Sequence, residues 1–484
     1  MTEMLPVLAV FLPMLGGVLV FLLGCGPRNA WSVLTVMLSL TPSLLLVQQV
    51  AAVGTVEHHL GGWAPPLGIR LMADGLSALM ILLTAVVGGL VSMHALGHFA
   101  ERANAARNFW VLWPLLWGSL NALFLSADLF NAYVTLELVT LAAIPLVLLA
   151  GSAQAVNAAL RYLILALFGS MLYLAGVALV YGLIGTLDMQ LAAERLSGAG
   201  WVLDLAAALM VTGLLVKAAI VPFHLWLPDA HGGAPAPVSA LLSALVVKAA
   251  VYLLLRLWSG PLFEPLSQPA AAWLLAGLGV AAILYGSVQA LRQRRLKLVV
   301  AYSTVAQLGY MLLLFPMAGL LAWQGVIYHG VAHGVAKAAL FLAAGNILYQ
   351  LGHDRIVDMR GSGSVLAISF GCFALAGVSI MGLPPSGGFL AKWLLLQGSL
   401  QAGAWWLALV ILAGGLLAAG YVFRVLRAAF QVPDPDAEEK LPEVRHIGAM
   451  MRWPMLLLAL TAIGLGFAGE PLLTLLGDVP GRLG

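Results

Sequence analysis

Four lysines lie inside long apolar segments of this sequence, where surface lysines are not expected. They are Lys217, Lys248, Lys337 and Lys392, and they make up four of the six lysines in 484 residues. A charged side chain at the centre of a membrane helix costs roughly 2.5–3.5 kcal/mol. The cost falls when the amine loses its proton, because burial can lower the pKa of a lysine by several units. The chemistry that these residues favour is therefore reversible proton binding.

A glutamate and two histidines accompany the lysines. Glu137, in FNAYVTLELVTLAAIPL, is the clearest carboxylate deep within an apolar segment and the natural partner for a buried lysine. His329, His333 and Lys337 are spaced i, i+4 and i+8 in YHGVAHGVAKAALF. This spacing places them on one slowly drifting face of a helix. We interpret these residues, with the lysines, as one titratable row.

Each of these residues also has a simpler interpretation. A lysine near a helix end can extend to the lipid headgroups, and Lys248 lies only eight residues before Arg256. A membrane histidine often only donates a hydrogen bond between helices, and histidines at i and i+4 can bind a metal. No carboxylate or cysteine accompanies His329 and His333 at ligand spacing, so we predict no metal site, and the sequence contains no cofactor motif.

Two apolar segments that carry these lysines contain helix-breaking residues. Pro222 follows Lys217 by five residues and cannot donate to the carbonyl of Ala218. The second break is in MGLPPSGGFLAKW, where Pro384, Pro385, Gly387 and Gly388 precede Lys392. Broken helices survive at membrane depth only when they are buried in protein or line water. Two broken lysine-bearing segments in the two halves of one chain indicate an internal repeat around an ion path.

The composition places these segments in a membrane protein. The sequence is 62% hydrophobic and only 9% charged, which is far outside the range of soluble proteins. Apolar runs of about 20 residues mark membrane-spanning helices. We predict an all-α polytopic protein, with residues 1–484 forming a single membrane domain of about fourteen spans. The predicted spans are 4–24, 30–52, 72–96, 109–126, 128–150, 160–185, 203–230, 236–258, 271–290, 298–319, 324–349, 366–399, 404–428 and 449–473.

Several other classes of protein are excluded. The first apolar run has no basic leader and no small-residue cleavage site, so we expect it to stay as a span. Cys25 and Cys372 lie far apart in hydrophobic segments, which suggests neither a disulfide framework nor a cysteine metal site. The segment 431–446 is too short to fold alone and is predicted to be a connector. A net charge of +3 is too small to imply a nucleic-acid partner.

The basic residues predict the orientation in the membrane. Loops after odd-numbered spans hold fifteen of them: Arg28, Arg102, Arg107, Arg161, Arg292, Arg294, Arg295, Lys297, Arg355, Arg360, Arg424, Arg427, Lys440, Arg445 and Arg452. The other loops and the C-terminus hold four: Arg70, Arg195, Arg256 and Arg482. Because basic loops stay in the cytoplasm, we expect both termini outside a bacterial cytoplasmic (inner) membrane.

Four motifs together carry a family resemblance. VKAAIVPFHLWLPDAHGGAPAPVSALLSALVVKAAVY, LVVAYSTVAQLGYMLL, HGVAHGVAKAALFLAAGN and GLPPSGGFLAKW closely resemble the proton-conducting antiporter-like subunits of respiratory complex I, Mrp cation/proton antiporters and membrane-bound hydrogenases. The resemblance covers at least residues 70 to 430. It implies two inverted five-helix repeats, at 109–258 and 271–428, with the broken spans 203–230 and 366–399 as helices seven and twelve.

The resemblance also implies a role for each residue of the row. Glu137 matches the family's glutamate, Lys217 the lysine of the first broken helix, and Lys248 the connecting group that follows it. His329 and His333 match its polar pair, with Lys337 next, and Lys392 matches the terminal group of the second broken helix. One branch of complex I subunits carries glutamate at that last position, so the lysine here argues against that branch.

The predicted function is proton translocation, within a hetero-oligomeric membrane complex, along Glu137, Lys217, Lys248, His329, His333, Lys337 and Lys392. The resemblance leaves open an Mrp D-type, a hydrogenase-type or a smaller complex I subunit, with protons and in the first case Na⁺ as its ions. No catalytic site is visible in the chain itself, so an enzymatic activity would belong to such a complex. Two alternatives are a free-standing cation transporter, which would need oxygen ligands near Asp74, Asp204 or Asp229, and a membrane partner for inorganic-carbon uptake.

Overall fold

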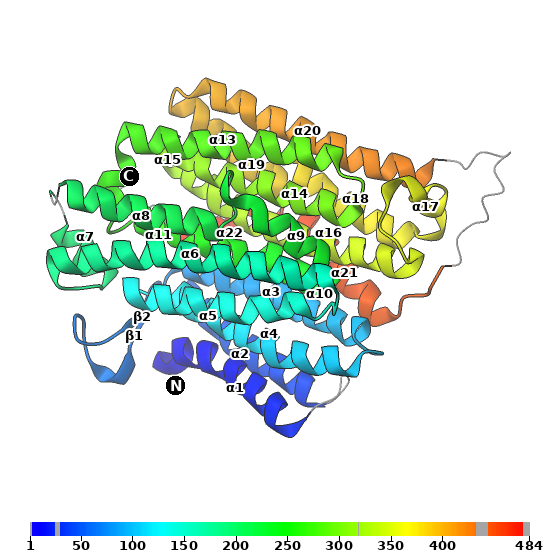
Figure 1. Cartoon of the computed structure of the whole chain (residues 1–484). Helices are drawn as coiled ribbons and strands as arrows, with labels where there is room; N and C mark the ends of the chain where they lie inside the picture. Colours follow the sequence, from blue (N-terminus) through cyan, green and yellow to red (C-terminus); the bar gives the residue numbers. More distant parts are fainter. Residues whose placement is uncertain are drawn as a thin grey trace.

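The computed structural model describes residues 2–24, 30–196, 198, 200–317, 319–431 and 444–477. Cys25, Arg28, Lys440, Arg482 and most of the predicted connector 431–446 lie outside these residues, as does the C-terminus whose orientation was predicted. Within them the chain forms long helices that lie side by side (Figure 1).

The first half of the chain contains α1 (Leu5–Leu23), α2 (Ala30–Val53), α3 (Gly75–His98), α4 (Ala103–Leu125), α5 (Leu129–Leu148), α6 (Ala153–Ile184), α7 (Met189–Arg195), α8 (Trp201–Lys217), α9 (Trp226–Gly233), α10 (Ala236–Leu241), α11 (Val247–Trp258) and α12 (Phe263–Ser267). The second half contains α13 (Pro269–Arg292), α14 (Leu296–Gly309), α15 (Leu314–Met317), α16 (Leu320–Leu351), α17 (Ser362–Val365), α18 (Ala367–Met381), α19 (Gly387–Gln401), α20 (Trp405–Phe430), α21 (Ala449–Gly464) and α22 (Gly469–Leu476).

Most of the predicted spans correspond to one apolar helical segment. Among the described residues, eleven such segments are long and apolar enough to cross a membrane, or twelve if α21 and α22 form one span. The remaining two predicted spans, 203–230 and 366–399, are each split into shorter helices: α8 and α9 in the first case, α18 and α19 in the second. The all-α polytopic fold is therefore confirmed, and the two lysine-bearing breaks interrupt it.

The last predicted span, 449–473, is not straight. Its two helices, α21 and α22, meet at an angle of 82°. The turn between them contains Gly466, and a side chain at this position would collide with the backbone carbonyl of Pro385. The bend therefore packs against the second broken span, and only glycine allows this close approach.

The helices that carry the central lysines are the most buried. In the most apolar window of Ala236–Trp258, which holds Lys248, every residue is buried, and in α16, which holds Lys337, the share is 94%. The outer helix α2 is only 33% buried over its window. Lys248 and Lys337 therefore lie on the inner helices of the molecule.

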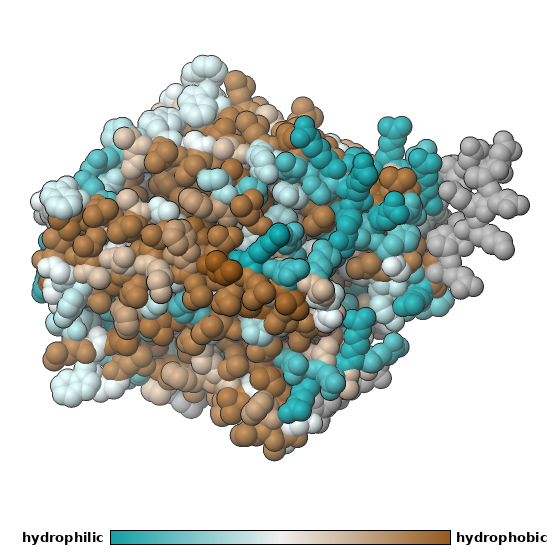
Figure 2. All heavy atoms as spheres, in the orientation of Figure 1, coloured by the Kyte–Doolittle hydropathy of each residue, from teal (hydrophilic) through white to brown (hydrophobic). Residues whose placement is uncertain are grey.

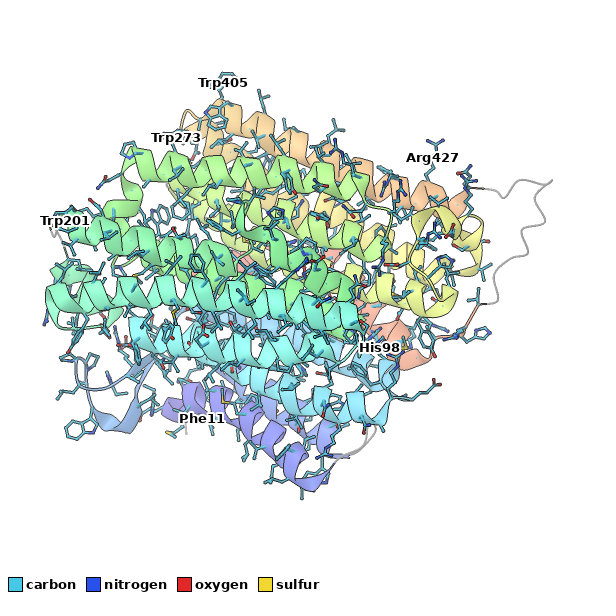
Figure 3. All side chains as sticks on the ribbon, in the orientation of Figure 1. Phe11, His98, Trp201, Trp273, Trp405 and Arg427 are labelled. Carbon is cyan, nitrogen blue, oxygen red and sulfur yellow. The ribbon has the colours of Figure 1, made fainter. Side chains whose placement is uncertain are left out.

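One short hairpin departs from the all-helical pattern. Strands β1 (Val56–His59) and β2 (Arg70–Ala73) pair antiparallel, with Val56 opposite Ala73. We call the end of the molecule with β1, β2 and α7 the hairpin end, and the opposite end, where α13 meets α14, the arginine end. Figure 2 shows a mainly hydrophobic face whose hydrophilic side chains gather toward the arginine end. Arg427 and His98 lie at this end and Trp201 at the other (Figure 3).

Several basic residues that were predicted to lie in loops are part of helices, and Arg161, Lys297 and Arg256 are three of them. Arg161 is in α6, because that helix begins at Ala153 rather than near 160, and its guanidinium pairs with Asp229 at 2.5 Å. Lys297 is in the first turn of α14, where it is buried and donates to the carbonyl of Ala234. Arg256 is in the last turn of α11. Each has a polar partner within the protein, so it does not need an aqueous loop.

Candidate functional site

The first group of the row is a buried ion pair. Lys217 is the last residue of α8, and its Nζ lies 2.5 Å from the Glu137 carboxylate of α5. The same amine donates to Thr140 Oγ1 at 2.9 Å, and Ser170 of α6 donates to Glu137. The side chains of Lys217 and Glu137 are only 5% and 16% exposed. Because breaking a buried pair leaves an uncompensated charge, the two residues act as one unit.

The chain leaves the helix directly after this lysine. Ala219 adopts a left-handed conformation with φ of 54°, which is unfavourable for a residue with a side chain. Pro222 then begins the short 3₁₀ segment Phe223–Leu225 that precedes α9. The Trp226 indole donates to the buried carbonyl of Val216, in the last turn of α8, at 3.0 Å. Its ring stacks on Tyr162 with the ring centres 4.1 Å apart. This tryptophan thereby holds the open end of α8 in place.

The second group lies at the centre of the molecule. Lys248 follows a π-helical segment, Leu242–Val246, and donates to the carbonyl of Ser243 within it. Such π segments are rare and often occur at functional sites. Lys248 is only 2% exposed, so it does not extend to the headgroups. Within the described residues, no direct hydrogen bond joins it to Lys217.

A hydroxyl bridge lies between Lys248 and Lys337. The Ser243 hydroxyl lies 2.9 Å from that of Thr304 on α14, and Thr304 donates to the carbonyl of Val300 at 3.1 Å. Lys337 of α16 donates to the same Val300 carbonyl at 2.9 Å. On the other side Lys248 reaches Ser243 through its backbone carbonyl and not through its hydroxyl, so the bridge lies beside both lysines without bonding directly to either amine. Sequence reasoning did not identify Ser243 or Thr304.

The polar pair follows on α16. The rings of His329 and His333 stack with centroids 5.7 Å apart. His329 Nε2 lies 3.1 Å from the carbonyl oxygen of Gln307, whereas both ring nitrogens of His333 have no hydrogen-bond partner among the described residues. Buried polar atoms are normally satisfied by protein or by ordered water. His333 is therefore placed to exchange protons with water between Lys337 and His329.

Lys392 closes the row in a different way from Lys217. It lies in the second turn of α19 and donates to the carbonyls of Ile380 and Met381 at 2.8 and 3.1 Å. These carbonyls end α18, where the helix dipole favours a cation. The amine also lies 4.8 Å from the centre of the Tyr310 ring, which packs against His329 at 5.2 Å.

Residues of the second break set this geometry. A side chain at Gly388 would collide with the carbonyl of Ser379, and one at Gly387 would lie 2.6 Å from the Leu465 Cβ atom. Pro384 and Pro385 occupy the turn between α18 and α19. Gly388 allows α19 to start close against α18, which brings Lys392 to the open end of that helix, and Gly387 allows the same turn to pack against the end of α21.

The acids that a sodium transporter would need are dispersed. Asp74 pairs with Arg256, Asp229 pairs with Arg161, and Asp204 is contacted only weakly, by Gln268 at 3.5 Å. Within the described ranges, no group of three or more histidine, cysteine, aspartate or glutamate residues could hold a metal ion. These three aspartates therefore do not assemble into a cation site.

Comparison with known proteins identifies the family. A family model described as "NADH:quinone oxidoreductase/Mrp antiporter, TM" matches residues 126–418, more than half of the chain. The chain belongs to this family. The resemblance of its four motifs is thereby confirmed, and the matched residues include the whole row from Glu137 to Lys392.

Two relatives are similar to this chain over nearly its whole length. NADH-quinone oxidoreductase subunit N of Desulforudis audaxviator is 34% identical over 98% of both chains. The D-type subunit of the Na⁺/H⁺ antiporter of Alkalihalophilus pseudofirmus is 30% identical over 89% of this chain and 86% of its own.

Two solved structures contain a chain with the same fold as this one. A chain of the Mrp complex from Dietzia sp. DQ12-45-1b superposes with a TM-score of 0.89 at 26% identity, covering 100% of this chain and 97% of its own. A chain of an archaeal membrane-bound sulfane sulfur reductase superposes at 0.88 and 27% identity, covering 99% and 97%. Both belong to multisubunit membrane complexes.

Proposed function

We propose that this chain is a proton-translocating membrane subunit of a multisubunit complex of the Mrp antiporter or complex I type. The observation that carries the proposal is the Glu137–Lys217 ion pair at the end of a broken helix, in line with three further buried lysines. The lysines are held by hydroxyls, carbonyls and one carboxylate. These contacts leave the amines within reach of small polar groups, which is what a proton relay needs.

The proposed transfer begins at the ion pair. A proton on Lys217 strengthens its attraction to the Glu137 carboxylate, whereas a proton on Glu137 weakens that attraction. The two residues therefore titrate as a coupled pair. The charge then passes to Lys248, across the Ser243–Thr304 bridge to Lys337, and through His333 and His329 to Lys392. The two halves of this path correspond to the proposed repeats, 109–258 and 271–428.

The partners and the orientation are parts of the same proposal. The relatives named above are subunits of larger complexes, and the exposed apolar sides of the outer helices leave room for neighbouring membrane subunits. Among the described residues, the arginine end carries Arg102, Arg107, Arg292, Arg294, Arg295, Arg355, Arg360, Arg424, Arg427, Arg445 and Arg452. We place this end in the cytoplasm of a bacterial cell. If the complex is of the Mrp type, we propose that it exchanges Na⁺ for protons, as the name of the Alkalihalophilus pseudofirmus relative states for that protein.

The decisive experiment removes the ion pair. Glu137→Gln and Lys217→Ala are each introduced into the assembled complex, and proton uptake into proteoliposomes is driven by the native reaction. We expect both variants to lose translocation while the complex still assembles. The control is Asp354→Asn, because Asp354 is a buried acid that pairs with Arg295 at 2.9 Å, away from the row. Normal proton uptake in both row variants would refute the proposal.

A further inference from the structure

The helix face that carries Lys248 continues toward the hairpin end. Lys248, Tyr252 and Arg256 are spaced i, i+4 and i+8 on α11, so they lie on one face of that helix. The row described above uses only Lys248. Tyr252 and Arg256 extend from the centre of the molecule toward the surface at the hairpin end.

A small cavity separates Lys248 from Tyr252. Both residues line it together with Leu76 and Met80 of α3, and its volume for a water-sized molecule is about 20 Å³. Its lining residues are all buried. About 10–15 Å³ of such volume is enough for one water molecule, which also needs polar partners. Lys248 and Tyr252 are the two residues of the cavity lining that carry a polar side-chain group.

The Tyr252 hydroxyl begins a polar chain on the other side of this cavity. It donates to the backbone carbonyl of Phe124 at 2.5 Å, accepts a hydrogen bond from Arg256 Nε at 2.8 Å and lies 3.2 Å from the Ser77 hydroxyl. The Ser77 hydroxyl in turn donates to Asp74 Oδ1 at 3.0 Å. Asp74, which caps the start of α3, forms two hydrogen bonds with the Arg256 guanidinium, one of them at 2.5 Å.

Asp74 opens onto the hairpin end. Asp74 and Arg256 both line a pocket of about 1100 Å³, together with Arg70 of β2 and Glu470 of α22. Burial raises the pKa of the Asp74 carboxyl. The charge of the adjacent Arg256 guanidinium and the hydrogen bonds from Arg256 and Ser77 together outweigh this effect and lower the pKa from 3.8 to about 2. Asp74 is therefore an ionised acceptor at neutral pH.

We propose that Tyr252, Ser77 and Asp74 form a proton connection between Lys248 and the pocket at the hairpin end. The row then reaches water from its middle. Arg256 positions this connection, because it holds both the Tyr252 hydroxyl and the Asp74 carboxylate. Its fixed charge also opposes the passage of metal cations. The inference rests on the proposed function, since it requires a mobile proton on Lys248.

The transfer balances at every atom. The Lys248 ammonium gives one proton to water in the small cavity, and this water gives one to the Tyr252 oxygen. The Tyr252 hydroxyl turns from the Phe124 carbonyl toward Ser77 and passes its own proton to it, Ser77 passes its own to the Asp74 carboxylate, and Asp74 releases one proton to the pocket. Each oxygen gains one proton and loses one, so the net change is one proton moved from Lys248 to the hairpin end. The reverse sequence loads Lys248 from that side.

A purely structural role would need fewer of these features. Capping α3 requires only the hydrogen bond from the Ser77 backbone to Asp74. Joining α3 to α11 requires only the Asp74–Arg256 pair. The Tyr252 hydroxyl also binds the carbonyl of Phe124 near the end of α4. None of these roles needs a space for water between that hydroxyl and a buried lysine, and the connection to Lys248 accounts for that space.

Tyr252→Phe tests the relay with little change in shape. We expect proton translocation by the whole complex in proteoliposomes to fall about tenfold or more, with assembly unchanged. Tyr328→Phe is the matched control, because Tyr328 is also buried and donates to a backbone carbonyl, that of Leu465, away from the cavity. We expect the control to stay within about twofold of the unmodified complex. Normal translocation in Tyr252→Phe, while Lys217→Ala is inactive, would overturn this inference and leave the proposed function intact. Normal translocation in both would overturn the proposed function itself.

A second measurement does not depend on transport. Met80 lines the small cavity but not the large pocket. In a chain with Cys25 and Cys372 replaced by alanine, Met80→Cys is exposed to a small anionic, membrane-impermeant thiol reagent on the hairpin side. We expect labelling to be at least about tenfold faster when Tyr252→Ala is added, because the cavity and the pocket both border Leu76 and removal of the Tyr252 ring enlarges the cavity beside it. An unchanged rate would show that the two spaces are not connected through Tyr252 and would overturn the inference.

Discussion

The Lys392 amine lies against the face of the Tyr310 ring, 4.8 Å from its centre, and donates to two carbonyls at the end of α18. Lys217, the corresponding lysine of the first broken span, instead pairs with the carboxylate of Glu137. One lysine is thus balanced by a full negative charge, and the other by helix-end dipoles and an aromatic face. In the proposed relay, the two end lysines therefore hold their charge through different chemistry.

Substitutions of Lys392 distinguish a relay from a fixed cation. Lys392→Arg keeps a positive charge that cannot be shed, whereas Lys392→Met removes the charge and keeps much of the length. If Lys392 carries a mobile proton, both variants should lose coupled proton uptake in proteoliposomes while the complex assembles. Rescue by arginine with a loss of assembly in the methionine variant would instead indicate a structural cation.

The hydroxyl bridge across α14 can be cut without changing its shape. Thr304→Val removes the hydroxyl that joins Ser243 to the Val300 carbonyl, and we expect proton transfer to slow by about one to two orders of magnitude. Thr84→Val serves as the control, because the Thr84 hydroxyl is also buried but bonds only to the carbonyl of Met80 in its own helix. Equal rates in the two variants would exclude the bridge from the path.

Gly388 should be intolerant of even the smallest side chain. A Cβ atom there would overlap the carbonyl of Ser379, so Gly388→Ala must push α19 away from α18 and displace Lys392. We expect a loss of thermal stability of about 1–3 kcal/mol and a loss of proton uptake. Gly371→Ala, in α18, is the control, since no atom lies within 4 Å of its Cβ position. Melting of the purified complex in detergent would reveal both effects, and equal melting of the two variants would contradict the steric argument.

Trp226 should stabilise the first break through its indole nitrogen. Trp226→Phe keeps an aromatic ring against Tyr162 but removes the indole donor from the buried carbonyl of Val216, which retains the Ala219 N–H at 3.2 Å. Loss of one hydrogen bond costs about 0.5–1.5 kcal/mol, so the melting temperature of the complex should fall. An unchanged melting temperature would show that the indole hydrogen bond does not stabilise the break.

The orientation follows from thiol labelling. Gln293→Cys lies at the arginine end, and Trp63→Cys lies at the hairpin end, where the tryptophan is 64% exposed. In the background without Cys25 and Cys372, we expect an impermeant reagent to label only position 63 from outside intact cells. Labelling of position 293 alone would reverse the assigned orientation.

The sequence predicted the ionisable members of the row because such residues are costly in a membrane and therefore conspicuous. Ser243, Thr304 and Tyr310 gave no comparable signal, since hydroxyl and aromatic side chains are common in membrane helices and usually bond within their own helix. The hairpin β1–β2 was missed because its residues precede a long apolar run without clear alternation. Arg161 and Lys297 were placed in loops, because charge alone does not reveal a partner such as Asp229 or a backbone carbonyl that comes close only in the folded chain.

The surroundings of Lys392 limit how this position can change over evolutionary time. The atoms within hydrogen-bond distance of the amine, the carbonyls of Ile380 and Met381, are acceptors. A glutamate at 392 would meet oxygens that repel its charge and would find no donor in their place. A lineage that exchanges lysine for an acid here must also rebuild the end of α18, so the two residue types mark separate lines of descent and not interchangeable variants of one site.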